Sequence, residues 1–313
     1  MGSQASGILP SPSYSVGALR EDGKGLRARS GITMGTVVVE IAVKDDVRLL
    51  KALESLAAQT RPPDHVLVAA SPKTPEALAE AATSRWPAIH VELVRFPGGP
   101  VDARTLSLPY LREETTAFLD SDEIAPPDWL ATIVRPIEEG RAGYVGGPTR
   151  PLRAAENPIE RYYELLEVAI YDDLVRSSVT YLPLGNSAWP TRLLREFGFD
   201  PRVTAEDHDL ETRVQRAGYR GLYLPEAWVY HDKSNETSYV RWARKRYLYL
   251  FQMAMSMIKN RELSHRLAER RRPVRHPLRY VEAVMKPFAL VHAWIRWSRV
   301  GDRPPARPPR APG

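Results

Sequence analysis

The stretch TTAFLDSDEIAPPDWL, residues 115–130, decides the fold. Its first five residues are β-branched or apolar, as in a buried strand, and Asp120, Asp122 and Glu123 follow almost at once. In open parallel sheets, ligands bind outside the carboxyl ends of the strands. A buried strand that runs straight into acidic residues therefore predicts a ligand site at that end of a sheet.

The segments around this stretch alternate between strand and helix patterns. Strands are expected at 36–43, 65–70, 90–96 and 115–120. Helices are expected at 45–60, 74–86, 101–112 and 126–140, the first of them opened by an Asp cap. Such alternation with short connections predicts a Rossmann-like α/β fold. Its sheet would be mainly parallel, with helices on both faces.

Asp120 and Asp122 stand two positions apart at the end of the fourth expected strand. Side chains at positions i and i+2 of an extended segment point the same way, so both carboxylates would face one cleft. Their mutual repulsion needs a cation or a proton to relieve it. Oxygen ligands without a neighbouring His or Cys favour Mg²⁺ or Mn²⁺, usually shared with a phosphate. The alternative interpretation is a solvated acidic turn that caps the next helix.

The composition limits the class of protein. The 313 residues, with 43% hydrophobic content, suffice for one large α/β domain with an appendage or for two small domains. Because cysteine is absent, disulfides and thiolate metal sites are excluded, which fits a cytoplasmic protein. No apolar run approaches the ~20 residues of a membrane-spanning helix. Abundant Ala, Arg and Pro suggest a GC-rich bacterial genome.

Positive charge is concentrated towards the C-terminal end. Residues 241–313 contain 15 Arg and 3 Lys against 4 acids, whereas the other 240 residues contain 26 basic and 34 acidic groups. No nucleic-acid recognition motif accompanies this charge, so a nucleic-acid partner is not expected. The expected helix over 277–301 mixes apolar and basic residues. It would either lie in a membrane interface or pack on the rest of the protein.

Four further stretches follow LDSD in a fixed order. They are YVGGPTRP (144–151), YLPLGNSAWPTRLLREFGFDP (181–201), TAEDHDLETRVQRAGYRGLYLPEAWVYHD (204–232) and then a basic aromatic helix. Their order and spacing resemble the GT-A fold family-2 glycosyltransferases over about residues 36–250. The resemblance implies a metal-dependent inverting enzyme that moves a sugar from a nucleotide-diphosphate donor to an acceptor hydroxyl. The acceptor could be a glycan, a lipid-linked sugar or a natural product.

The resemblance also implies a division of the chain. A GT-A catalytic domain would span 34–240, with a donor half at 34–122 and an acceptor half at 123–240. A basic helical extension would follow at 241–301. The Gly-, Ser- and Pro-rich residues 1–33 and the Pro-rich residues 302–313 are expected to be disordered.

On the donor side, the resemblance assigns roles position by position. Asp46, in the turn after the first strand, would take the acidic role towards the nucleotide base, and Arg104 would face the diphosphate. Asp122 would bind Mn²⁺ or Mg²⁺ directly, while Asp120 would contact the ribose or a metal-bound water. The family's second strand usually ends in an Asp that contacts uracil, but Ala70 stands there, which leaves the nucleotide base undetermined.

On the acceptor side, Asp207 would be the general base that deprotonates the acceptor hydroxyl, with Glu206 beside it. His231 would complete the metal site. In the stretch GNSAW, Asn186 would hydrogen-bond an acceptor sugar and Trp189 would stack on one.

The basic helix would contribute Arg244 and Arg246 to the donor phosphates. Its position after the strand that ends in His231 is the reason for this assignment. The protein is therefore expected in the cytoplasm, either free or bound peripherally at the inner face of the plasma membrane through its basic C-terminal helices.

Two other interpretations stay open. A sugar-phosphate nucleotidyltransferase has a similar sheet, but it needs a Gly-rich basic loop where this chain has VKDDVR (43–48). The second is a non-catalytic protein with a degenerate transferase domain that binds a membrane or a partner. Ala70 and the altered first turn favour it, whereas the intact Asp120, Asp122 and Asp207 oppose it.

Overall fold

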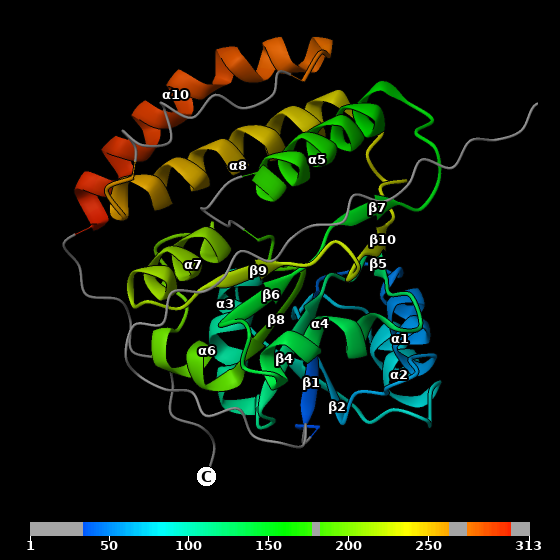
Figure 1. Cartoon of the computed structure of the whole chain (residues 1–313). Helices are drawn as coiled ribbons and strands as arrows, with labels where there is room; N and C mark the ends of the chain where they lie inside the picture. The colour runs from blue at the N-terminus through cyan, green and yellow to red at the C-terminus, as the bar shows by residue number, and fades with distance from the viewer. Residues whose placement is uncertain (1–33, 177–181, 263–273, 302–313) are drawn as a thin grey trace, which may run out of the picture.

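The structure, a computed structural model, describes residues 34–176, 182–262 and 274–301 (Figure 1). The expectations for residues 1–33 and 302–313 lie outside this part of the chain. Within it, seven strands form a central sheet and three form a small second sheet. The central sheet contains, in spatial order, β3 (Val91–Arg95), β2 (His65–Ala70), β1 (Val37–Val43), β4 (Thr115–Leu119), β8 (Asn186–Pro190), β6 (Tyr144–Gly146) and β9 (Gly221–Tyr223).

The central sheet is mainly parallel, as expected. β1, β2, β3 and β4 run in one direction, and β6 and β9 are parallel to each other. β8 is antiparallel to both of its neighbours, β4 and β6. The small sheet joins β5 (Glu123–Ile124), β10 (Val229–His231) and β7 (Thr149–Pro151), with β10 in the middle. It therefore brings the segment directly after Asp122 beside the segment that ends at His231.

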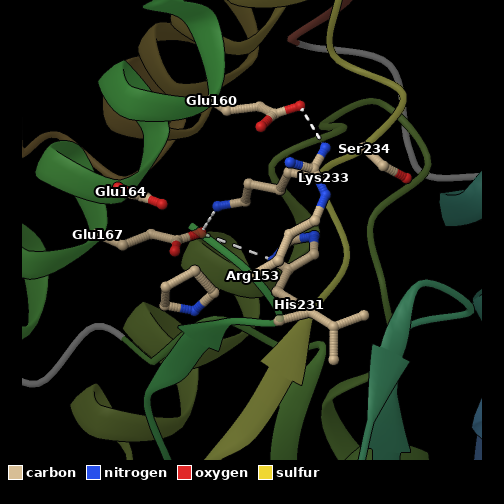
Figure 2. A pocket seen from close by; sticks show the side chains of 9 residues that line it. Arg153, Glu160, Glu164, Glu167, His231, Lys233 and Ser234 are labelled. Carbon is tan, nitrogen blue, oxygen red and sulfur yellow. Dashed lines mark hydrogen bonds and ion pairs between the residues drawn. The ribbon is translucent and has the colours of Figure 1, made fainter. Parts of the chain in front are cut away.

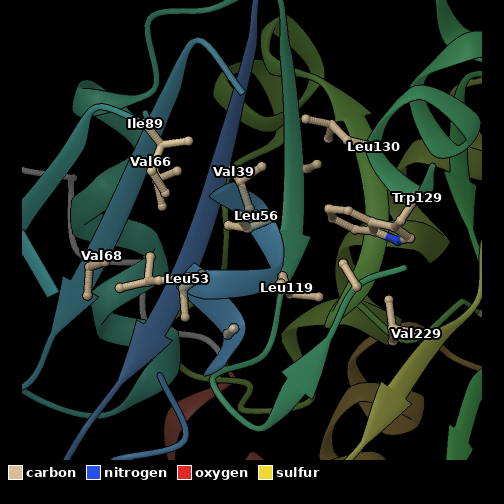
Figure 3. Close-up of a cluster of buried hydrophobic side chains, with 14 of the residues drawn as sticks. Val39, Leu53, Leu56, Val66, Val68, Ile89, Leu119, Trp129, Leu130 and Val229 are labelled. Atoms are coloured by element: carbon tan, nitrogen blue, oxygen red, sulfur yellow. The ribbon is translucent and has the colours of Figure 1, made fainter. Parts of the chain in front are cut away.

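Helices cover both faces of the central sheet because its strands are apolar on both sides. In β1, Val39 and Ile41 pack in the same cluster as Leu53, whereas Val38 packs in a second cluster on the opposite face (Figure 3). The first cluster is covered by α1 (Leu49–Ala57), α2 (Glu76–Ser84) and α4 (Trp129–Glu138). The other face carries α3 (Pro100–Ser107), the short 3₁₀ helix η1 (Leu108–Tyr110), α6 (Thr191–Phe197) and α7 (Glu206–Arg216).

Three long helices form a separate layer. They are α5 (Pro158–Arg176), α8 (Tyr239–Lys259) and α10 (Pro277–Val300), and Figure 1 shows α10 as the outermost of the three. The basic aromatic helix and the helix over 277–301 were expected, whereas α5 was not. Among the described helices, none is long and apolar enough to cross a membrane.

The inner face of α10 packs on α8. Ala293 of α10 is fully buried against Ala254 and Met255 of α8. Glu282 of α10 is 1% exposed and accepts a hydrogen bond from Arg246 of α8 (Nη2 to Oε1, 3.2 Å). The expectation that Arg246 reaches donor phosphates is therefore wrong: its guanidinium is buried between two helices, where it neutralises a buried carboxylate.

Candidate active site

The site lies where β4 ends, and a tight turn shapes it. The N–H of Asp120 donates to Glu123 Oε2 (3.0 Å), and the N–H of Glu123 donates to Asp120 O (3.0 Å). Because residues 120–122 form this turn instead of continuing the strand, Asp120 and Asp122 meet different partners. The two carboxylates lie at the same edge of the sheet, and the charge of Asp122 acts on Asp120. That both face one cleft stays a prediction.

Asp120 belongs to a cluster centred on Arg104 of α3. Arg104 Nη2 lies 3.2 Å from Asp120 Oδ1, and its Nη1 hydrogen-bonds Glu206 Oε1 at the start of α7. Gly185 makes room for this arrangement, because a Cβ there would lie 2.4 Å from Asp120 Oδ2. Arg104 thus joins the end of β4 to the first turn of α7, and three of the expected site residues come together.

Glu40 is a buried acid among the apolar residues of β1. It lies close enough to Arg104 for the two charges to interact. Its Oε1 accepts a hydrogen bond from Ser107 Oγ (3.0 Å). Burial, only partly offset by the charge of Arg104, raises the pKa of Glu40 to about 7. An acid in the middle of VVVEIAV is an unusual residue for a buried strand, and this signal could have pointed to the site from sequence.

Asp122 has partners from the turn after β1 and from the end of β10. Its Oδ2 lies 3.4 Å from His231 Nε2 and 3.4 Å from Arg48 Nη2, and its backbone O accepts the N–H of Asp232 (2.9 Å). Burial opposes ionisation of Asp122, but the contact with His231 and the charge of Arg48 outweigh it and lower the pKa to about 2. His231 therefore lies beside Asp122, as expected for a shared metal site.

Arg48 is a site residue that the sequence did not single out. It precedes α1, and Asp46 holds it: Asp46 Oδ1 accepts hydrogen bonds from the N–H (3.0 Å) and the Nε (2.9 Å) of Arg48. Arg48 Nη1 also donates to Asp232 O. The expected Asp cap does not form, because α1 begins after Arg48 without a side-chain cap. The described contact of Asp46 is thus with Arg48, and its role towards a nucleotide base stays a prediction.

Beside His231 lies a group of charged side chains, and its acids come from α5 (Figure 2). Glu167 Oε1 is 3.6 Å from His231 Nδ1 and forms an ion pair with Lys233 Nζ. Arg153 Nη2 donates to Glu160 Oε1 (2.9 Å) in the same pocket, whose volume of about 10 Å³ has room for a single water. A carboxylate behind a histidine is typical of metal sites, where it orients the imidazole.

Asp207, the expected base, is in the first turn of α7 and is half-buried. Its charge acts on both Arg104 and Asp120, so it lies on the same side of the site as they do. Its neighbour Glu206 is buried and hydrogen-bonded to Arg104. Burial first, opposed by Arg104, raises the pKa of Glu206 to about 7. The more accessible carboxylate of the pair is therefore Asp207.

The helix that carries Asp207 is fixed to α8 by buried charges. Asp209 is fully buried and contacts Lys259 Nζ (2.7 Å), Arg213 Nε (2.9 Å) and Asn260 Nδ2 (2.9 Å). Removing one partner of a buried pair typically costs about 3–5 kcal/mol, because the other charge stays uncompensated. The position of Asp207 thus depends on α8, a helix more than 30 residues later in the chain.

Asn186 and Trp189 are core residues, which corrects their expected contacts with an acceptor sugar. Asn186 is 1% exposed; its Nδ2 donates to Pro148 O (3.0 Å) and Ala227 O (2.8 Å), and its Oδ1 accepts from Trp129 Nε1 (2.8 Å). Trp189 is fully buried and stacks on Tyr144, with 4.1 Å between ring centroids. Neither side chain can reach a ligand without unfolding β8.

Arg244 lies on the exposed side of α8. It lines an open groove of about 510 Å³ together with Ser238, Val240, Arg241, Lys245 and Leu248. The charge of Lys245 helps to lower the pKa of Asp122, so one end of this groove lies near the acidic turn. The role of Arg244 towards donor phosphates stays a prediction.

The residues at the turn supply some of the ligands that a divalent cation needs. In the described part of the chain, no three His, Asp or Glu side chains form a ready set of ligands. Asp122 and His231 could supply two, and Mg²⁺ or Mn²⁺ sites commonly add substrate phosphates and waters. Burial and then the charge of Asp120 raise the pKa of Glu123 to about 8. A cation beside Asp122 would relieve this crowding of acids, so the residues fit.

Residues 35–249 match the glycosyltransferase-like family 2. The chain belongs to this family. Its family-2 relatives include the pre-mycofactocin glycosyltransferases of two Mycobacterium tuberculosis strains, CDC 1551 / Oshkosh and H37Rv, each 31% identical over 151 residues. These residues are 45% of this chain and 32% of each relative, so the match spans about a third of the relatives' length.

Solved glycosyltransferases share the fold of this family-2 chain. The mannosyltransferase PcManGT from Pyrobaculum calidifontis, in complex with GDP-Man and Mn²⁺, is 19% identical with a TM-score of 0.56 and 90% and 80% of the two chains covered. Glucosyl-3-phosphoglycerate synthase from M. tuberculosis, with Mn²⁺, UDP and phosphoglyceric acid, is 17% identical with a TM-score of 0.52 and 72% and 78% covered. The expected GT-A fold is confirmed, and so is the expected family.

Proposed function

We propose that this family-2 glycosyltransferase moves a sugar from a nucleotide-diphosphate donor to an acceptor hydroxyl, with inversion and with Mn²⁺ or Mg²⁺. The observation that carries the proposal is the bridge formed by Arg104. It contacts Asp120 at the end of β4 and Glu206 at the start of α7. The donor-side acids and the expected base therefore belong to one electrostatic cluster at the carboxyl edge of the sheet.

Donor binding would use the side of the turn that faces Asp122. Asp122 and His231 would hold the cation, which would neutralise the diphosphate as it leaves. Lys245 and Arg244 are the cationic side chains proposed to receive the phosphates. Arg104 is buried against Asp120 and Glu206, and its contact with the diphosphate stays a prediction. Two solved structures of the same fold contain Mn²⁺ with GDP-Man or with UDP, which supports a donor of this kind. The nucleotide base is not assigned.

The transfer step would use Asp207. The acceptor oxygen attacks the anomeric carbon, the bond from that carbon to the diphosphate oxygen breaks, and its electron pair stays on the diphosphate. Asp207 takes the proton of the acceptor hydroxyl during this step. Glu206 is less suited to this task, because it is buried and bonded to Arg104.

A thermal-stability screen tests the proposal against the non-catalytic alternative. We expect one of UDP, GDP, TDP and CDP to raise the unfolding midpoint, and to do so only with Mn²⁺ or Mg²⁺. A ligand that binds only the folded state adds about 2.7 kcal/mol of stability at a concentration 100 times its Kd. Glucose 1-phosphate with Mn²⁺ is the control. If none of the nucleotides shifts the midpoint under any condition, the acidic turn does not bind a donor.

We also propose that the outer face of α10 binds an anionic membrane surface. This face is defined by exposed apolar residues, namely Tyr280, Val281, Val284, Phe288, Val291, Trp294 and Ile295. Lys286, Arg296 and Arg299 are exposed beside them, and Glu282, the one acid in the sequence of α10, is buried on the inner face. An apolar stripe flanked by cations, with aromatic residues, suits the interface of an anionic bilayer. The inner face of the plasma membrane is the proposed location.

The α10 proposal predicts a lipid preference. The protein should sediment with vesicles of phosphatidylglycerol, but not with vesicles of phosphatidylcholine. The double variant Phe288→Ser, Trp294→Ser should lose at least about 10-fold in partition, because each apolar side chain withdrawn from the interface contributes roughly 1.5–3 kcal/mol. Val168→Ser, an exposed apolar position on α5, is the matched control. Equal sedimentation of the double variant, or a dimer that this variant abolishes, would contradict the proposal.

A further inference from the structure

Two nitrogen-bearing side chains meet one oxygen of Asp122. Oδ2 is 3.4 Å from Nη2 of Arg48 and 3.4 Å from Nε2 of His231. A guanidinium stays protonated at any pH that a folded protein experiences, so Arg48 is a permanent positive charge at the oxygen that a cation would use. The side chain of Arg48 is 15% exposed, which reduces the screening of this charge by water.

Contacts with Asp46, Asp232 and Asp122 hold Arg48 in this place. Asp46 binds its guanidinium in a bidentate pair, with Nε–Oδ1 at 2.9 Å and Nη2–Oδ2 at 2.5 Å. Its Nη1 donates to Asp232 O, and the N–H of Asp232 in turn donates to Asp122 O (2.9 Å). Bidentate pairs of this kind fix the plane of the guanidinium as well as its position. The turn after β1, the acidic turn and the end of β10 are thus tied together around Arg48.

This position sets Arg48 in competition with a divalent cation. Like charges a few ångströms apart in a partly buried site repel strongly, so a cation that approaches Asp122 alone must overcome the field of Arg48. A nucleoside diphosphate brings several negative charges to the same edge of the sheet. These charges attract the cation and offset its repulsion by Arg48. The cation and the diphosphate should therefore bind far better together than the cation binds alone.

We infer that Arg48 is a built-in counter-ion of Asp122, which keeps the donor site assembled without a cation and makes cation binding depend on the nucleotide diphosphate. The inference rests on the proposed function and adds a positioning residue to it. Asp46 acquires a role as well, because its carboxylate holds the guanidinium in place.

Calorimetric titration with Mn²⁺, in the absence and presence of UDP or GDP, tests this inference. In Arg48→Met the affinity for Mn²⁺ alone should rise about 10-fold, because one positive charge is removed. The gain in Mn²⁺ affinity caused by the nucleotide should shrink by a similar factor. Arg48→Lys keeps the charge and should stay close to the wild type. Arg85→Met, which removes an exposed arginine at the end of α2, should change neither affinity.

A second variant, Asp46→Asn, tests the inference independently in case Arg48→Met does not fold. Asp46→Asn removes the carboxylate that compensates Arg48 and leaves the charge of Arg48, so it should weaken the binding of Mn²⁺ alone, in the opposite direction to Arg48→Met. The unfolding midpoint without ligand reports whether each variant is folded. Unchanged or weaker Mn²⁺ binding by folded Arg48→Met, or tighter binding by folded Asp46→Asn, would overturn the role of Arg48 alone. If no protein binds Mn²⁺ even with UDP or GDP, the proposed metal site fails and the inference fails with it.

Discussion

Asp207→Asn is expected to lower kcat by about 10²–10⁴-fold, the range over which a positioned general base accelerates a reaction. Asn has the size of Asp and cannot accept the proton of the acceptor hydroxyl. The first turn of α7 should stay intact, because Arg104 holds Glu206 and the buried Asp209 binds Lys259. Donor affinity should change little, because the proposed cation ligands are Asp122 and His231 and not Asp207.

The measurement is the rate of nucleoside diphosphate release with donor and acceptor present, together with the Kd of the donor. Glu226→Gln, which removes an exposed acid before β10, is the matched control and should keep the wild-type rate. Glu206→Gln should alter stability as well as rate, because Arg104 loses its buried partner. A kcat of Asp207→Asn within a few-fold of the wild type would remove Asp207 from the mechanism.

Asp122→Asn is expected to abolish the cation-dependent part of donor binding. Loss of residues in the outer shell of a metal site already costs about 10–100-fold in affinity, and loss of a direct carboxylate ligand should cost at least as much. Asp122 is also the carboxylate beside Arg48 and His231, so Asn leaves the permanent charge of Arg48 uncompensated where the cation would bind. Both effects weaken the binding of the cation.

The Kd of UDP and of GDP is measured once with Mn²⁺ and once with EDTA, which compares the site with and without the cation. In the wild type, EDTA should weaken binding strongly; in Asp122→Asn, Mn²⁺ and EDTA should give the same Kd. Asp45→Asn, which changes an exposed acid in the turn after β1, is the control. A wild-type response of Asp122→Asn to Mn²⁺ would show that the cation is held elsewhere.

Much of the central sheet could be predicted from sequence because its strands have a clear signal. HVLVAA was expected at 65–70 and forms β2 over His65–Ala70. A run of buried β-branched residues between turn signals leaves little ambiguity. Strands of two or three residues, such as β5 and β10, have too few residues for a period of two to be visible. They form only because the acidic turn and the end of β10 lie side by side.

Helix α5 was not predicted, although its sequence has a helical pattern. Ile159, Tyr162 and Leu166 of α5 have helical spacing and pack against Trp242 and neighbouring residues, so the signal was present in the sequence. Glu167, the residue of α5 that lies beside His231, could not be identified in this way. Its contacts with His231 and Lys233 join segments more than 60 residues apart, and no local pattern encodes such a pair.

The places of the expected site residues could be predicted where strand ends fix them, but the surroundings of a side chain could not. Asp120 and Asp122 lie at one edge of the sheet, because that is where β4 ends. Asn186 lies in β8 at that edge, opposite Leu119, whereas Trp189 lies farther from it, opposite Thr116. Their side chains point into the two opposite cores of the sheet. A motif that names a segment does not say which face each of its residues presents.

The most direct test of the donor site is a crystal grown with UDP or GDP and Mn²⁺, with diffraction collected above the manganese absorption edge. We expect one strong anomalous peak, within about 2–2.5 Å of an Asp122 carboxylate oxygen and in contact with the diphosphate. A peak at that position would establish the acidic turn as the place where cation and donor meet. A nucleotide bound elsewhere, or bound at the turn with no manganese beside Asp122, would contradict the metal-dependent transferase proposed above.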